Sequence, residues 1–154
     1  MKLNRLIACI LTILLSSSFL VAQKSNSRIE VLDNAAFDAK LLHIKGSLID
    51  LRSSDEVKSG LLPNAKVIDW EGESFKKSVS QLPHNQPVFL YCAGGFRSKE
   101  AAKWMQNDGF TTIIILKDGF DLWLSEGYTV VDLNGKVIQQ KKSVREKSPA
   151  STYE

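Results

Sequence analysis

Short apolar runs that alternate with amphipathic segments place the strongest constraint on how this chain can fold. The runs SLIDL (47–51), VFLYC (88–92) and TTIIIL (111–116) are apolar almost throughout, which is typical of parallel strands buried on both faces. Helical patterns separate them, as in a chain of βαβ units. The alternation predicts a three-layer α/β/α domain with a central, mostly parallel five-stranded sheet.

Local signals place the remaining elements. RIEVL (28–32) predicts a first strand, and Asp33 is positioned to cap a helix over 34–42. SSDE (53–56) has the pattern of a capping box that opens a short helix ending at Gly60. Further along the chain we expect a strand at 65–70, helices at 74–82, 98–108 and 119–123, and a hairpin around Asn134 and Gly135.

The N-terminus has the layout of a secretory signal peptide. Lys2 and Arg5 precede an apolar run that reaches the small residue Ala22 and then polar positions. Ser16–Ser18 interrupt this run before it reaches the roughly 20 apolar residues that a membrane span needs. We therefore expect cleavage after Ala22, export to the periplasm and no stable membrane insertion afterwards. Retention of the segment as a membrane anchor is the alternative.

Three segments follow from these patterns: a signal peptide at 1–22, one domain at 28–131, and a small hairpin with a flexible basic tail at 132–154. Removal of residues 1–22 lowers the formal net charge of the chain from +3 to +1, because Lys2 and Arg5 are lost. So small an excess of positive charge argues against a nucleic acid partner.

Cys92 is the only cysteine that the cleaved chain would keep, because Cys9 lies in the signal segment. An unpaired cysteine in an exported protein indicates reactivity or intermolecular pairing. Cys92 follows a strand and precedes a helix, at the edge where parallel sheets bind ligands. Gly94 and Gly95 allow backbone N–H groups to converge on an anion, and Arg97 and the helix N-terminus add positive charge. This setting favours a nucleophilic thiolate and needs no metal.

At this loop the residues resemble the rhodanese-like sulfurtransferases. CAGGFRS (92–98) is similar to the C-x-x-G-x-R-S active-site loop of that family. LIDLRSSDEVKSGLLPNA (48–65) resembles its Asp-x-Arg and E…G-x-I-P-x-A segment, and LKDGFDLW (116–123) resembles its GG-aromatic-x-x-W element. The resemblance covers about residues 28–131. Leu61 and Val67 depart from it, because histidine and asparagine are usual in the family at these positions.

The resemblance implies a thiolate at Cys92 that takes a sulfane sulfur from thiosulfate or polysulfide, holds it as a persulfide and passes it on. It implies Asp50 and Arg52 as supporting framework residues. The implied partners are a small anionic sulfur donor and a thiol or cyanide acceptor, a thioredoxin-like protein among them, with no cofactor and no metal. The substrate would be bound by Ala93, Gly94, Gly95, Phe96, Arg97 and Ser98, with Arg97 orienting an anionic donor.

Three alternatives stay open. A non-catalytic module of the same fold would bind a partner or carry a persulfide without turning over a small donor. A cysteine phosphatase or arsenate reductase also closes a cysteine loop on an arginine, but the six residues from Cys92 to Arg97 favour sulfur transfer because the related phosphatases use one more. The third alternative is an inert buried cysteine, against which the neighbouring glycines and arginine argue.

Overall fold

The computed structural model describes residues 27–141. Its five-stranded sheet is parallel throughout, with the order β1-β5-β4-β2-β3, which confirms the predicted fold class. The signal segment at 1–22 and most of the predicted tail lie outside the described residues, so export stays a prediction. The strands of the sheet are β1 (Arg28–Leu32), β2 (Ser47–Asp50), β3 (Lys66–Val67), β4 (Val88–Tyr91) and β5 (Thr112–Leu116).

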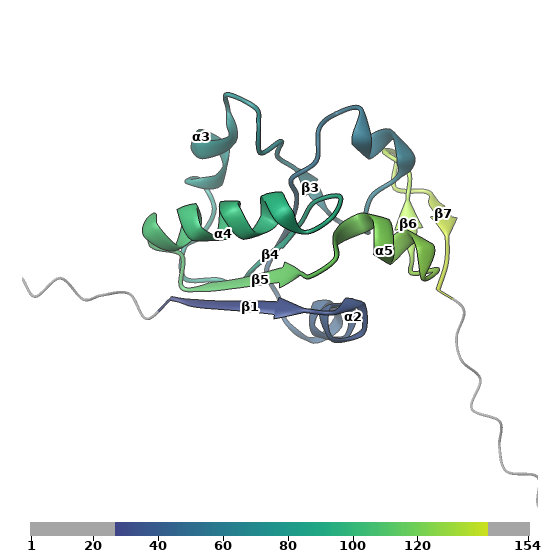
Figure 1. Ribbon diagram of the computed structural model, residues 1–154, viewed down its shortest axis with the longest axis horizontal. Coiled ribbons are helices and arrows are strands. Elements are labelled where there is room, and N and C mark those ends of the chain that lie inside the picture. Colours follow the sequence, from purple (N-terminus) through teal and green to yellow (C-terminus); the bar gives the residue numbers. More distant parts are fainter. Residues whose placement is uncertain (1–26, 142–154) are drawn as a thin grey trace, which may run out of the picture.

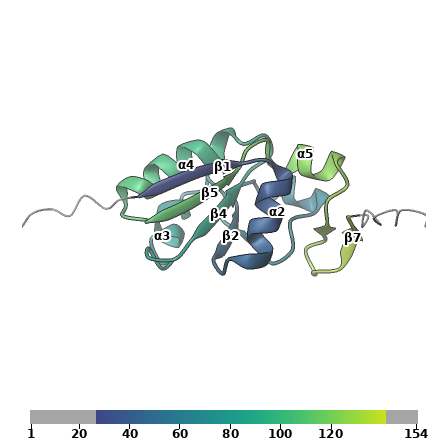
Figure 2. The same ribbon diagram turned by 90° about the horizontal axis from the view of Figure 1, so that it is seen from below.

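Helices cover both faces of the sheet (Figure 1). On one face lie α3 (Phe75–Val79) and α4 (Phe96–Asn107), and on the other lies α2 (Asn34–His43). In Figure 2, which views the domain from below, α2 lies in front of the strands. The short helix α5 (Gly119–Ser125) follows β5 and lies beyond its carboxyl end. Among the described residues, no helix combines the length and the apolar character needed to cross a bilayer.

Strand β4 shows why the central runs are apolar at every position. Val88 and Leu90 belong to the core on the α4 face, whereas Phe89 and Tyr91 belong to the core on the α2 face. All four side chains are buried, because successive residues of a strand point to opposite faces and both faces here are covered. A strand in this position has no solvent-facing side on which a polar residue would be tolerated.

The predicted caps form as hydrogen bonds. The Asp33 carboxylate accepts from the backbone N–H of Ala36 at 2.9 Å, at the start of α2. In the capping box, the N–H of Ser53 donates to the Glu56 carboxylate at 2.9 Å, and the N–H of Glu56 donates to the Ser53 hydroxyl at 3.4 Å. The short helix that follows, η2 (Glu56–Ser59), is a single 3-10 turn.

Several elements differ in length from the predictions. The strand predicted at 65–70 is reduced to β3, an edge strand that pairs only with β2, and the helix predicted at 74–82 forms only over α3. Helix α4 starts at Phe96, two residues before the predicted Ser98, because Gly95 in the left-handed region turns the chain directly into the helix. The apolar pattern marks the buried part of an element, whereas neighbouring strands and turns decide its ends.

The predicted hairpin forms from β6 (Val130–Val131) and β7 (Val137–Gln139). It is tied to the domain, because Leu61 and Val131 exchange two backbone hydrogen bonds of 2.9 Å. The side-chain amide of Gln139 donates to the carbonyls of Leu124 and Tyr128. The hairpin therefore closes the end of the domain that contains α5 (Figure 1).

A buried ion pair joins the end of β2 to η2. The guanidinium of Arg52 contacts the Asp50 carboxylate at 2.7 Å, and the two side chains are 2% and 0% exposed. Arg52 also donates to the carbonyl of Gly60 at 2.7 Å and to that of Glu56 at 3.4 Å, and it lies 3.7 Å from the centre of the Phe120 ring. Most donors of Arg52 are thus used inside the protein, which a buried charge requires.

We expect Arg52→Ala to lower the free energy of unfolding by about 3–5 kcal/mol, because it leaves the Asp50 carboxylate buried without its cation. Arg28→Ala is the matched control: this arginine also pairs with a carboxylate, that of Glu30, but its side chain is 74% exposed. The control should cost less than about 1 kcal/mol. Urea denaturation of both variants measures the difference, and equal losses would contradict a special role for the buried pair.

Candidate active site

Cys92 lies at the carboxyl end of β4, the strand between β5 and β2 in the sheet. Its side chain is buried, and it is a free cysteine. The segment from Cys92 to Ser98, called the cysteine loop below, leads directly into α4. The N-cap residue of this helix, Gly95, makes no side-chain cap hydrogen bond. The first N–H groups of a helix have no partner within it, so the start of α4 offers backbone donors beside the cysteine loop.

Two glycines allow this loop to pack tightly against its neighbours. Gly95 has a φ of +81°, and a Cβ on it would lie 2.0 Å from the carbonyl oxygen of Lys117. Gly119, the first residue of α5, has a φ of +69°, and its Cβ would lie 2.1 Å from the carbonyl oxygen of Ala93. A side chain at either position would collide with backbone and would strain a conformation that L residues avoid.

The start of α5 holds the cysteine loop by backbone hydrogen bonds. The N–H of Phe120 donates to the carbonyl of Cys92 at 2.8 Å, and the N–H of Asp121 donates to the carbonyl of Ala93 at 3.1 Å. The close approach at Gly119 makes these bonds possible. The residues on either side of the sulfur are therefore tied to α5.

Gly94 differs from Gly95. It is exposed, its φ is not positive, and a Cβ on it would meet nothing within 4 Å. The fold therefore gives no steric reason for a glycine at this position. Ala93 is half-buried, and Phe96, the first residue of α4, is 78% exposed.

Arg97 forms a bidentate ion pair with Glu56. Its two terminal nitrogens contact the two carboxylate oxygens at 2.8 and 2.5 Å. The side chains are 22% and 34% exposed, so the pair lies at the rim of the site. Glu56 is 41 positions from Arg97 in the sequence, and the sequence pattern identified it only as a capping residue.

The ion pair stabilises the charged form of both partners. Hydrogen bonding to Arg97 lowers the pKa of Glu56 to about 2, and the hydrogen bonds from Ser53 act in the same direction. Hydrogen bonding to Glu56 raises the pKa of Arg97, and the nearby Cys92 sulfur contributes to this rise. Each partner of the ion pair therefore keeps its charge over a wider pH range than it would alone.

Ser98 ends the loop with a buried hydroxyl. Its side chain is 0% exposed, and its Oγ has no hydrogen-bond partner among the described residues. A buried polar atom without a partner is costly unless a ligand or a water molecule satisfies it. This hydroxyl is the one side-chain atom of the loop that needs a partner from outside the fold.

Asp50 and Arg52 support the loop indirectly. Arg52 donates to the backbone carbonyl of Glu56, and the side chain of Glu56 then binds Arg97. The structure thus connects the buried pair to the cysteine loop through η2.

Within residues 27–141, no three His, Cys, Asp or Glu side chains come together in a way that would hold a metal ion.

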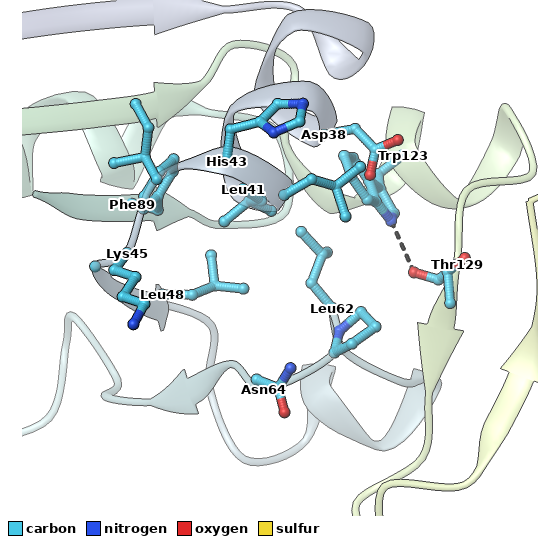
Figure 3. A pocket seen from close by; sticks show the side chains of 14 residues that line it. Asp38, Leu41, His43, Lys45, Leu48, Leu62, Asn64, Phe89, Trp123 and Thr129 are labelled. Atoms are coloured by element: carbon cyan, nitrogen blue, oxygen red, sulfur yellow. Dashed lines mark hydrogen bonds between the residues drawn. The ribbon is translucent and has the colours of Figure 1, made fainter.

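A cavity of about 580 Å³ lies elsewhere, on the α2 face of the sheet (Figure 3). Its apolar wall includes Leu48, Leu62 and Phe89, and Trp123 closes one side while donating a hydrogen bond to the carbonyl of Thr129 at 3.0 Å. None of its lining residues belongs to the cysteine loop. The candidate site is therefore identified by its chemistry and not by the size of a cavity.

Comparison with known proteins points in one direction. A family model described as the rhodanese-like domain matches residues 31–126. A protein named sulfurtransferase from Allochromatium vinosum is 26% identical over 88 residues, which cover 57% of this chain and 80% of that protein. A tRNA uridine(34) hydroxylase from Buchnera aphidicola is 38% identical over 77 residues, which cover 46% of this chain but only 24% of the hydroxylase.

Solved structures agree on the fold. A rhodanese-like domain protein from Staphylococcus aureus superposes with a TM-score of 0.55 at 23% identity, covering 74% of this chain and 99% of that one. A rhodanese-related protein from Thermoplasma volcanium gives a TM-score of 0.59 at 22% identity, covering 66% and 97%.

Gly94 and Gly95 should tolerate replacement by alanine to very different degrees. Gly95→Ala should lower the free energy of unfolding by at least about 2 kcal/mol, because it adds a backbone collision to a strained φ. Gly94→Ala adds the same methyl group in open space and should change stability by less than about 0.5 kcal/mol. Urea denaturation of the two variants tests this, and similar losses would show that the loop is not held as described.

The lowered pKa of Glu56 predicts how stability depends on pH. Because the folded protein depresses this pKa from its ordinary 4.5 to about 2, the stabilisation is present above pH 4.5 and is lost as the pH falls toward 2. Glu56→Gln should therefore lose stability less steeply than wild type in this window. Glu100→Gln, which removes an exposed carboxylate paired with Lys103, is the control and should keep the wild-type slope in urea titrations.

Proposed function

This chain belongs to the rhodanese-like domain family, and from that premise we propose that it is a sulfurtransferase in which Cys92 carries a sulfane sulfur as a persulfide. The observation that supports this most directly is the setting of Cys92. It is a buried free cysteine at the carboxyl end of β4, in a loop that contains Arg97 and is hydrogen-bonded to the start of α5. The donor is thiosulfate or a polysulfide, and the acceptor is a thiol or cyanide.

In the first step the Cys92 thiolate attacks the outer sulfur of the donor. With thiosulfate, a bond forms between the cysteine sulfur and the outer sulfur, and the bond between the two thiosulfate sulfurs breaks. Sulfite leaves with the electron pair of that bond, and the outer sulfur keeps one negative charge on Cys92. The total charge is conserved, and no external oxidant or reductant is needed.

In the second step the acceptor attacks the outer sulfur of the persulfide. Cyanide leaves as thiocyanate and restores the Cys92 thiolate, and a thiolate acceptor instead leaves as a persulfide. The chain thus returns to its starting state after one cycle. Two displacements through a covalent intermediate correspond to the general scheme of nucleophilic catalysis.

The surroundings of Cys92 suit a negatively charged outer sulfur. The open N-terminus of α4 places backbone N–H groups and the positive end of the helix dipole beside the loop. The buried hydroxyl of Ser98 lacks a partner in the described residues and would donate to a bound anionic sulfur. These donors are already in place before the reaction, so they need no reorganisation when the charge arrives.

The proposal predicts one added sulfur atom on Cys92. Intact-mass analysis of the protein after thiosulfate or polysulfide should show this adduct, and cyanide should remove it. Cys92→Ser should show no adduct and no transfer, because the sulfur nucleophile is gone. A persulfide carrier without turnover would also lose the adduct in Cys92→Ser. Production of thiocyanate by the wild-type protein separates a sulfurtransferase from such a carrier.

A failure of both donors to load Cys92 would contradict sulfur transfer from small donors and favour the non-catalytic binding module. Undiminished thiocyanate production by Cys92→Ser would exclude Cys92 as the carrier. Retention of the fold by the variant should be checked by its unfolding midpoint, since Cys92 is buried.

A further inference from the structure

The ion pair between Arg97 and Glu56 changes what the loop presents to a donor. Arg97 is the only cationic side chain in the loop from Cys92 to Ser98, and both of its terminal nitrogens are bound to the Glu56 carboxylate. The positive charge that the sequence predicts for an anionic donor is therefore already compensated. When Cys92 reacts as a thiolate, it brings a further negative charge to the same loop.

Glu56 is not free to move away from Arg97. Its carboxylate also accepts the N–H of Ser53 at 2.9 Å, and its backbone carbonyl accepts from the buried Arg52. A donor oxyanion that displaced Glu56 would have to break a bidentate, charge-assisted contact that is held from two further sides. Such contacts are among the stronger hydrogen bonds in proteins.

The charge of the sulfur donor then affects how readily it reaches and reacts with Cys92. Thiosulfate carries two negative charges and meets in this loop an arginine whose charge is offset and a thiolate that repels it. A thiol persulfide carries at most one negative charge on its sulfur chain, so it loses little by the absence of a free cation. Like charges at close range cost free energy, and the cost rises with the charge of the ligand.

We propose that Glu56 is a specificity-determining residue, which biases Cys92 toward persulfide donors of low charge and against dianionic thiosulfate. The inference rests on the proposed function, because it concerns the donor of the same reaction. The loading step remains balanced: Cys92 attacks the outer sulfur of R–S–SH, a new S–S bond forms, the old one breaks, and RS⁻ leaves with the electron pair. No other reactant is required.

Glu56→Gln separates the charge of Glu56 from its structural role. Glutamine keeps an oxygen that can accept the N–H of Ser53, and it is the other residue found at this position of a capping box. The substitution therefore removes the negative charge and preserves the start of η2. Glu100→Gln removes an equal charge on the exposed surface of α4 and controls for the net charge of the protein.

The experiment measures the second-order rate constant for loading Cys92, by rapid quenching and intact mass, with thiosulfate and with 2-hydroxyethyl persulfide. In Glu56→Gln we expect thiosulfate to load about tenfold faster or more, and the persulfide to change by less than about twofold. High salt should reduce the gain, because it screens the freed charge of Arg97. Taking the ratio of the two constants within one variant cancels any partial loss of folded protein.

A second substitution tests whether the gain acts through Arg97. In the double variant Glu56→Gln with Arg97→Ala, the faster loading by thiosulfate should disappear, because the freed cation is gone. An equal gain in Glu100→Gln, or a parallel change for both donors in Glu56→Gln, would overturn the proposal. Normal loading with an unchanged donor ratio refutes only this inference, whereas no loading by either donor in any variant refutes the proposed sulfur transfer together with it.

Discussion

The buried ion pair between Asp50 and Arg52 is the interaction on which the site depends. It fixes the point where β2 ends, and the remaining donors of Arg52 hold the carbonyls of Glu56 and Gly60. Glu56 in turn holds Arg97 at the cysteine loop. The buried pair is thus connected to Arg97 through one turn of 3-10 helix.

Much of the fold was predictable because the relevant signals are local. A strand buried on both faces is apolar at almost every position, so β4 and β5 could be located from their own residues. The ends of α3 and β3 could not, because they depend on neighbouring elements and on edge pairing. The early start of α4 reflects the left-handed Gly95, which packs against the backbone of Lys117 just after β5 and carries no helical pattern of its own.

The candidate site was predictable to a similar degree. The strand-to-helix position of Cys92 and the presence of Arg97 in its loop follow from a continuous stretch of sequence. The bond from Glu56 to Arg97 spans 41 positions, and Gly119 approaches the loop from another element. No periodicity or spacing encodes these contacts. They are the contacts that compensate the charge of Arg97 and hold the loop against α5.

The three glycines at the site differ in how many residue types their positions can accept. Gly95 and Gly119 are enclosed by backbone, so related chains that keep this loop have a single residue type available at each. The position of Gly94 faces open space and accepts a range of side chains. Variation at that one position would change the exposed surface of the loop two residues from the sulfur while leaving the fold intact.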